Sequence, residues 1–155
     1  MKRWMWIICG ILAFQMLGKT GEDLETLKPV QLLQVEKEQE QIILKTDTGD
    51  RVRGNTLRLA LEDMQETADG RIFLETADYL LLTEGTEELV PELRKQLRPA
   101  VRLCMAEKNG NLKKLAQFLS AHEPGVSLGQ YGYGKEKLPV LIMRKGRLKL
   151  AGNYG

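Results

Sequence analysis

Short apolar runs alternate with helix-like segments through the centre of this chain, and this alternation limits the possible folds more than any other feature. The runs 71–75, 79–83 and 100–106 are best interpreted as strands, the second of them buried on both faces. Segments that begin near residues 55, 86 and 111 carry apolar side chains at helical spacings of three and four. The pattern predicts an α/β or α+β fold, with a mixed sheet and about three helices.

Start and stop signals bound the three predicted helices. Asn55 is a natural N-cap for the first helix, and Asp69-Gly70 breaks it. Thr86 is the predicted cap of the second helix, which Pro99 ends, and the turn 109–111 opens the third. The stripes predicted to face the sheet are Leu57, Ala60, Leu61, Met64 and Ala68; Leu89, Val90, Leu93 and Leu97; and Leu112, Leu115, Ala116 and Leu119.

A hairpin is predicted at each end of the domain. The runs 30–36 and 41–46 are separated by a short charged segment, and a turn at 47–50 follows them. The runs 138–143 and 147–151 flank Lys145-Gly146 in the same way, after a glycine-rich loop at 125–134. The sheet is therefore expected to have antiparallel strands at both ends.

Residues 1–18 differ from the rest of the chain. Lys2-Arg3 precede an uncharged apolar run that ends at Leu17, and Gly18 follows, which is the layout of a secretory signal. No Ala-x-Ala pattern precedes Lys19, so a short uncleaved membrane anchor remains an alternative. We expect a polar tether at 19–28 and a single domain at 29–155, on the extracytoplasmic face of a membrane.

Charge and composition exclude several classes of protein. The 155 residues include 23 Lys and Arg and 21 Asp and Glu, for a formal charge of +2. Without Lys2 and Arg3 the charges balance, which disfavours binding to nucleic acid through its phosphates. One histidine and two cysteines rule out His/Cys zinc clusters and disulfide scaffolds. Cys9 lies in the leader, and Cys104 is expected to be a buried structural thiol.

The segment Gly125-Val-Ser127-Leu-Gly129 has the spelling of a hydrolase nucleophile elbow. That chemistry needs a sharp strand-to-helix turn and a histidine later in the chain. Pro124 precedes this segment, a glycine-rich loop follows it, and no histidine lies downstream. We therefore interpret it as a loop, and the competing hypothesis is a hydrolase that uses Ser127 with His122 as its base.

The segment Gly129–Lys135 resembles a phosphate-binding loop. Glu136 stands where the magnesium-binding Ser or Thr would be, and an apolar strand follows instead of a helix. We expect an ordinary loop and no cofactor. Its tyrosines, Tyr131 and Tyr133, are a possible partner contact, because exposed aromatic side chains on loops are frequent at interfaces.

The remaining titratable side chains form no recognisable catalytic set. The acidic runs 36–40, 62–63 and 87–88 are interleaved with Lys and Gln or lie on polar helix faces, and are expected to be solvated surface. His122, with Glu123 beside it at a helix end, is expected to be a charge partner rather than a general base. The sequence therefore predicts neither an enzyme nor a metal site.

Two strings in the domain resemble a known family. Gly54-Asn-Thr-Leu-Arg-Leu-Ala-Leu61, followed by the strand Tyr79-Leu-Leu-Leu-Thr-Glu-Gly85 that leads into a helix, is similar to the N-terminal domain of the Ger(x)C family. These proteins are the C subunits of nutrient germinant receptors in spore-forming bacteria. Pro139–Ile142 and Leu148–Gly152 resemble the segment that ends this domain. The resemblance spans about residues 29–152 and implies a truncated member of the family or a fragment of one. The lipobox cysteine that is usual in the family is absent from this sequence.

The resemblance implies a non-catalytic, membrane-associated interaction module in spore germination. Its expected partners are membrane-embedded germinant receptor subunits, and its expected location is the spore inner membrane. The alternative is a small exported ligand-binding or structural domain unrelated to germination.

Overall fold

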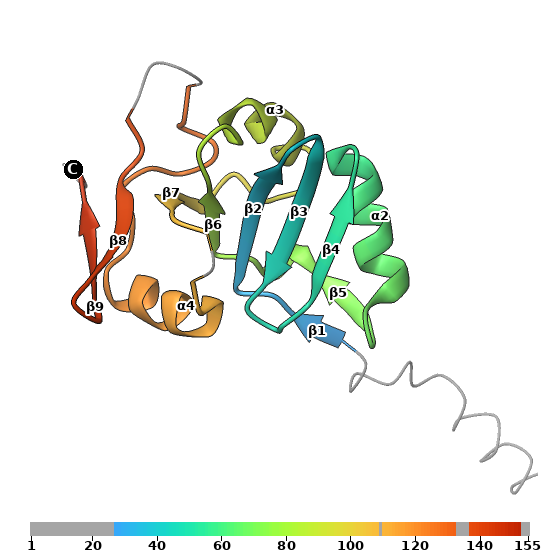
Figure 1. The fold of residues 1–155 in the computed structure, drawn as a ribbon, viewed down its shortest axis with the longest axis horizontal. Helices are drawn as coiled ribbons and strands as arrows, with labels where there is room; N and C mark the ends of the chain where they lie inside the picture. The colour runs from blue at the N-terminus through green and yellow to red at the C-terminus, as the bar shows by residue number, and fades with distance from the viewer. Residues whose placement is uncertain (1–26, 109, 133–136, 153–155) are drawn as a thin grey trace, which may run out of the picture.

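The computed structural model describes residues 27–108, 110–132 and 137–152, which form a seven-stranded mixed sheet and a small two-stranded one. The large sheet has the order β4-β3-β2-β6-β7-β8-β9, and β1 pairs with β5 in the small sheet (Figure 1). The strands are β1 Leu27–Pro29, β2 Leu32–Glu38, β3 Gln41–Thr46, β4 Arg51–Gly54, β5 Arg71–Phe73, β6 Tyr79–Leu82, β7 Arg102–Ala106, β8 Val140–Arg144 and β9 Arg147–Ala151. This is an α+β fold, within the fold class that the sequence predicted.

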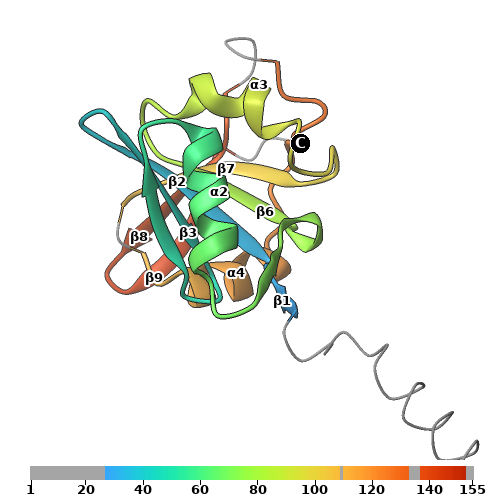
Figure 2. The ribbon, with the colours of Figure 1, turned by 90° about the vertical axis from the view of Figure 1, so that its right-hand side faces the viewer.

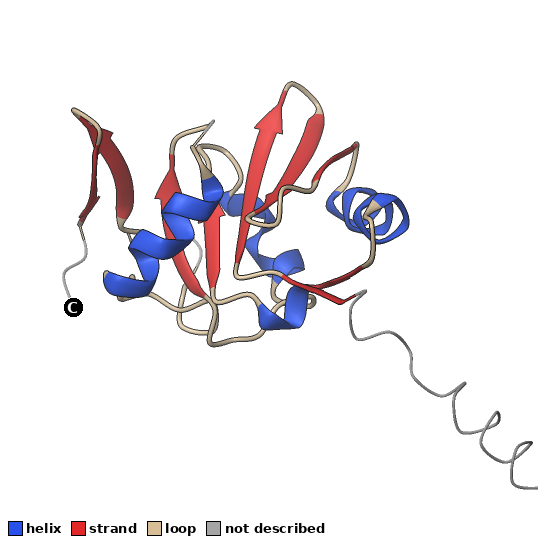
Figure 3. Ribbon diagram, turned by 90° about the horizontal axis from the view of Figure 1, so that it is seen from below, coloured by secondary structure: helices blue, strands red, loops and turns tan. Residues whose placement is uncertain are grey.

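Helices cover both faces of the large sheet in the described part of the chain. They are α2 Leu57–Thr67, α3 Val90–Leu93 and α4 Leu112–Ala121, with short 3₁₀ turns η2 Leu74–Thr76 and η3 Glu87–Leu89. Helix α2 stands against β3 and β4, with α3 beyond its upper end (Figure 2). Helix α4 lies on the opposite face (Figure 3). The result is a sheet between two unequal helical layers.

The centre of the large sheet is parallel and its ends are antiparallel. Strand β6 pairs in parallel with both β2 and β7, and β7 pairs in parallel with β8. Strands β2 and β3 form one hairpin, and β8 and β9 form the other. Both predicted hairpins are therefore confirmed, and the crossover segments between the parallel strands supply the helical layers.

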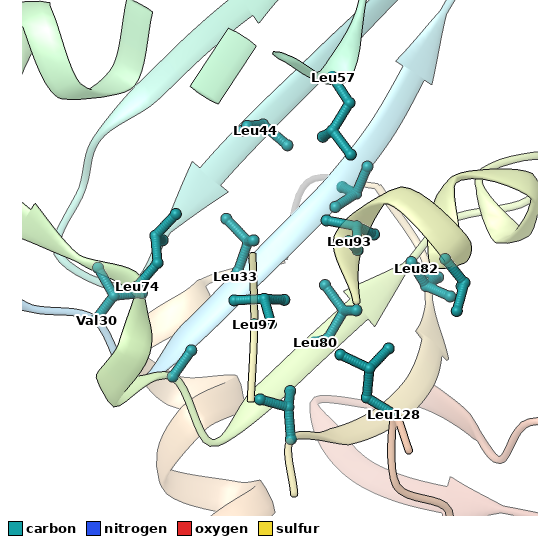
Figure 4. Close-up of a cluster of buried hydrophobic side chains, with 14 of the residues drawn as sticks. Val30, Leu33, Leu44, Leu57, Leu74, Leu80, Leu82, Leu93, Leu97 and Leu128 are labelled. Atoms are coloured by element: carbon teal, nitrogen blue, oxygen red, sulfur yellow. The ribbon is translucent and has the colours of Figure 1, made fainter. Parts of the chain in front are cut away.

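Side chains alternate strictly between two apolar cores. Leu80 and Leu82 of β6 join the core under α2 and α3, which Figure 4 shows, while Tyr79 and Leu81 join the core under α4. All four residues of β6 are buried, as the sequence predicted for a strand covered on both faces. Full burial of each leucine stabilises the fold by roughly 1.5–3 kcal/mol before entropy is counted.

Two of the predicted helices begin at side-chain caps. Thr56, one residue after the predicted Asn55, accepts a hydrogen bond at Oγ1 from Leu59 N at 3.2 Å. Asn111 Oδ1 accepts one from Lys114 N at 3.1 Å at the start of α4. Gly54 precedes α2 for a steric reason, because a Cβ there would lie 2.5 Å from Ala60 N.

The second helix differs from its prediction. It shrinks to η3 and the four residues of α3, and Thr86 Oγ1 donates to Thr83 O at 2.8 Å instead of capping it. Pro91 has no backbone N–H to donate, so it is tolerated only in the first turn of a helix. Regular α-helix therefore begins at Val90, directly before Pro91. Val90, Leu93 and Leu97 are nevertheless buried, as the helical spacing predicted.

Two further differences involve strands. Strand β4 was not predicted, because Val52 is its only apolar side chain and it gains its pairing from β3. Strand β1 begins at Leu27, inside the predicted tether, and pairs in parallel with β5. The predicted strand 71–75 is cut short, because Leu74 already belongs to η2. The leader, residues 1–18, lies outside the described residues.

Candidate interaction groove

A surface groove of about 890 Å³ separates α2 from the η3–α3 segment. Its apolar lining residues, here called its apolar floor, are Leu61, Leu74 and Pro91, of which Leu74 is only 8% exposed. Its other lining side chains are polar or charged: Arg58, Glu62, Gln65, Glu66, Glu88, Glu92, Lys95 and Gln96. An apolar floor with a charged rim is the usual composition of a surface that receives another polypeptide.

The α2 wall of the groove follows from helical periodicity. Helix α2 buries Leu57, Ala60 and Met64 against the sheet. The residues that directly follow them, Arg58, Leu61 and Gln65, therefore lie at the side of the helix and line the groove. Glu62 accepts a hydrogen bond at Oε1 from Arg58 Nη1 at 2.8 Å, an exposed pair one helical turn apart. Glu66, one turn further, is exposed and also lines the groove.

The opposite wall repeats this pattern with Glu88 and Glu92, again one turn apart. Lys37 Nζ, from the end of β2, donates to Glu88 Oε1 at 2.7 Å. The hydrogen bond and the charge of Glu88 raise the pKa of Lys37. Four glutamates line the groove against two cations, Arg58 and Lys95, and with Lys37 at Glu88 the groove carries a net charge of −1. Its field favours a positively charged partner.

The predicted contact at Tyr131 does not have the expected exposure. Tyr131 is 4% exposed and belongs to the core under α2 and α3, together with Leu128. Arg94 holds this loop in place, because its Nε donates to Leu128 O at 3.0 Å and its Nη2 donates to Tyr131 O. The glycine-rich context indicated an exposed loop, but the loop closes the core. Tyr133 lies outside the described residues.

Ser127 and His122 are engaged with different neighbours. Ser127 Oγ donates to Gln130 Oε1 at 2.9 Å, and the backbone of Ser127 bridges to Arg102. The His122 ring stacks on Phe118 with 4.4 Å between centroids, and His122 Nδ1 lies 3.2 Å from Phe118 O. No hydrogen bond joins Ser127 to His122 in this described segment, so the arrangement lacks the contact that a base would need to activate the serine.

The other sequence candidates are also structural in the described residues. Glu123, the predicted neighbour of His122, accepts a hydrogen bond from Arg102 Nε at 3.3 Å. Cys104 is fully buried, and burial raises the pKa of its thiol to about 12, so it remains protonated, and its prediction as a structural thiol is confirmed. Gly129 N donates to Pro99 O at 2.8 Å, so this amide already forms a hydrogen bond within the fold. Residues 133–136 of the phosphate-loop-like segment lie outside the description.

The groove itself was missed in the sequence, although a signal for it was present. Glu62 and Glu66 in one helix, and Glu88 and Glu92 in another, are each spaced by one turn. The acidic runs that contain Glu62 and Glu88 were interpreted as solvated surface, which is their usual role, and Glu66 and Glu92 were not singled out. The two acidic faces flank one apolar floor because of the way α2 and α3 pack on the sheet. The spacing of residues within either helix does not contain that information.

No family model, curated protein or solved structure matches the chain. Within residues 27–108, 110–132 and 137–152, no group of three or more His, Cys, Asp or Glu side chains could hold a metal ion. Over the same residues, no helix is long and apolar enough to cross a membrane.

Proposed function

We propose that the chain is a non-catalytic interaction module that acts at a membrane in spore germination and docks to membrane-embedded germinant receptor subunits. The observation that carries the docking is the groove between α2 and α3, with its apolar floor and four glutamates. The germination context rests on the resemblance of residues 29–152 to the N-terminal domain of the Ger(x)C family.

The groove favours a partner segment that is both apolar and basic. An amphipathic helix would place apolar side chains on Leu61, Leu74 and Pro91 and cations near Glu66 and Glu92. Burial of the apolar side chains supplies the affinity, while the carboxylates orient the segment and speed its approach. We therefore propose that the receptor subunit contributes a basic amphipathic segment.

Charge reversal in the groove tests the docking. Glu66→Lys with Glu92→Lys places two cations on the rim at exposed positions, where folding is little affected. In a strain that lacks the native gene, we expect this variant to restore at most about a tenth of the nutrient-triggered germination rate, since like charges across an interface cost several kcal/mol. Glu38→Lys with Glu84→Lys is the matched control at exposed positions outside the groove, and it should restore the full rate.

The outcomes separate the parts of the proposal. An unchanged response to every nutrient after gene deletion would contradict the role in germination and favour the exported ligand-binding or structural domain. Full restoration by the groove variant would contradict docking through the groove, but not the role in germination. Labelling by a serine-directed reagent that disappears in Ser127→Ala would contradict a non-catalytic role. Full-length protein in the cytosol after fractionation would contradict the extracytoplasmic location that residues 1–18 predict.

A further inference from the structure

The charges of the chain are segregated along its sequence, although they nearly balance overall. From Lys137 to Gly155 there are five cations, Lys137, Arg144, Lys145, Arg147 and Lys149, and no acidic side chain. The preceding 136 residues hold the other 18 cations and all 21 acidic residues, a net charge of −3. Four of the five cations lie on the β8–β9 hairpin.

The hairpin has a tight turn and two different faces. Lys145 and Gly146 form a two-residue turn with φ values of +50° and +74°, the left-handed conformations that a tight hairpin needs. Directly opposite residues share a face, so Leu141 and Leu150 lie together and join the core under α4. The other side, here called the basic hairpin face, carries Val140, Ile142, Arg144, Arg147, Lys149 and Ala151.

The basic hairpin face has apolar side chains at its base and cations toward its turn. Arg144, Arg147 and Lys149 are exposed, Val140 is 40% exposed, and Ile142 and Ala151 are half-buried. The hairpin stands at the edge of the sheet farthest from β4 and α2 (Figures 1 and 2). The acidic groove and the basic hairpin face therefore belong to different parts of the molecule.

We propose that the basic hairpin face docks on the surface of an anionic phospholipid membrane. Cations that border a patch of aliphatic side chains suit this boundary, because the cations meet the phosphates while the aliphatic groups enter the headgroup layer. Nucleic acid is a poorer match, since residues 137–152 offer no aromatic side chain on which a base could stack.

The distribution of charge also orients the molecule. The acidic remainder of the chain is repelled by an anionic surface, so the hairpin end approaches it first. The groove between α2 and α3 then remains open to a partner. Docking of the hairpin on a membrane does not depend on a role in germination.

Matched charge variants of the full chain test the electrostatic part. Arg144→Gln, Arg147→Gln and Lys149→Gln together remove the cations of the basic hairpin face. Arg51→Gln, Arg53→Gln and Arg71→Gln remove three exposed cations on β4 and β5, so both variants have the same net charge. The native chain and both variants carry the same leader, so its contribution to binding is equal in all three. The measured quantity is the affinity for phosphatidylcholine vesicles that contain phosphatidylglycerol, divided by the affinity for vesicles of phosphatidylcholine alone.

We expect the hairpin variant to lower this ratio about 100-fold at low salt, since each cation near the surface changes partitioning about fivefold. The control variant should lower it by less than about threefold, because the cations of β4 and β5 lie toward the opposite edge of the large sheet and interact more weakly with the lipid charges. High salt should remove the difference between the variants. Equal losses in the two variants would overturn the proposal, because they would show that only the net charge matters.

An environment-sensitive fluorophore tests the contact itself. In a Cys9→Ser background, Val140→Cys places the label on the basic hairpin face, and the buried Cys104 does not compete. Leu59→Cys is the control on α2, at a side chain that is 43% exposed. We expect a blue shift at position 140 alone when vesicles containing phosphatidylglycerol are added. Vesicle-bound protein without this shift, or a shift produced only by polyanionic nucleic acid, would overturn the proposal.

Discussion

The sheet face under α2 and α3 is lined by apolar side chains from β3, β2, β6 and β7, whereas the face under α4 also carries Gln34, Glu36 and Lys45. Gln34 and Glu36 follow Leu32 at intervals of two, so they point to the α4 face, and Lys45 lies directly opposite Gln34. Apart from Thr46, the first face needs only apolar side chains of suitable volume. The second depends on particular polar pairings, and the two should respond differently to mutation.

The polar cluster contains an ion pair that is almost fully removed from water. Lys45 Nζ donates to Glu36 Oε1 at 2.7 Å, and the two side chains are 14% and 4% exposed. Gln34 Nε2 donates to Glu107 O at 3.2 Å, while Gln34 Oε1 is buried without a partner among the described residues. An unsatisfied buried oxygen costs about 1–3 kcal/mol, so this face already has little tolerance for further unpaired groups.

The largest effect is expected for Lys45→Met. It removes one partner of the buried pair and leaves the Glu36 carboxylate uncompensated, which costs about 3–5 kcal/mol. Denaturant unfolding at neutral pH should show this loss as a lower midpoint. The double variant Glu36→Leu with Lys45→Met should recover most of it, because two apolar side chains replace the pair without an unpaired charge. If the double variant is as unstable as Lys45→Met, the pair contributes through packing and not through charge.

The adjacent leucines of β6 compare the two faces directly. Leu80 and Leu81 are both completely buried but point into opposite cores. We expect Leu80→Ala to cost about 3–4 kcal/mol and Leu81→Ala about 2–3 kcal/mol, since the cost depends on how far the surroundings collapse into the cavity. Helix α4 is the only helix that covers its face among the described elements, so it can move inward more easily. Equal costs in denaturant unfolding would mean that both cores are equally rigid.

The helix caps extend the comparison to the start of each layer. Thr56→Ala and Asn111→Ala each remove one side-chain hydrogen bond to a backbone amide, at the starts of α2 and α4. Each should lower the free energy of unfolding by about 1 kcal/mol. Thr67→Ala is the control, because its exposed hydroxyl bonds only to Asp63 O, within the same helix. A larger loss for Asn111→Ala than for Thr56→Ala would show that α4 depends more on its cap than α2 does.

The sequence predicted the features that depend on local patterns. The buried stripes of α2 and α4, the two hairpins and the doubly buried strand β6 follow from spacing of apolar side chains, and each was confirmed. Strand β4 could not be found in this way, because its pairing with β3 stabilises a segment with one apolar side chain. Tyr131 was expected on the surface, but Arg94, 37 positions earlier in the chain, donates to its carbonyl oxygen, and Tyr131 lies in the core under α2 and α3.

The candidate site was harder to predict than the fold because it is not local. The groove joins α2 to α3, and its acidic rim combines carboxylates that are 26 positions apart in sequence, Glu62 and Glu88. The Glu36–Lys45 pair likewise depends on the register of β2 against β3, and a shift by one residue would turn Lys45 to the other face. Periodicity predicts which side of an element is apolar, but not which polar side chains of different elements meet.

The smallest effect is expected at Asp50, which lies in the turn between β3 and β4 and belongs to neither apolar core. It closes the turn between β3 and β4 and pairs with Lys28 Nζ at 3.4 Å, which ties β1 to the large sheet. Burial alone would raise the pKa of Asp50, but hydrogen bonds from Thr48 and Thr46 and the charge of Lys28 outweigh it and lower the pKa. The ionised form is therefore favoured by folding.

We expect Asp50→Asn to cost about 0.5–1 kcal/mol at neutral pH, because the amide keeps only one of the two accepting oxygens and loses the charge. A lowered folded-state pKa stabilises the protein above the unfolded value of about 4, and this contribution disappears as the pH falls through the folded pKa. The difference between the native chain and Asp50→Asn should therefore shrink below about pH 4 in denaturant unfolding. Lys28→Met should give a loss of the same size with the same pH dependence, since it removes the charge that Asp50 faces. A loss for Asp50→Asn that stays constant down to low pH would assign the effect to the geometry of the turn and not to the ion pair with Lys28.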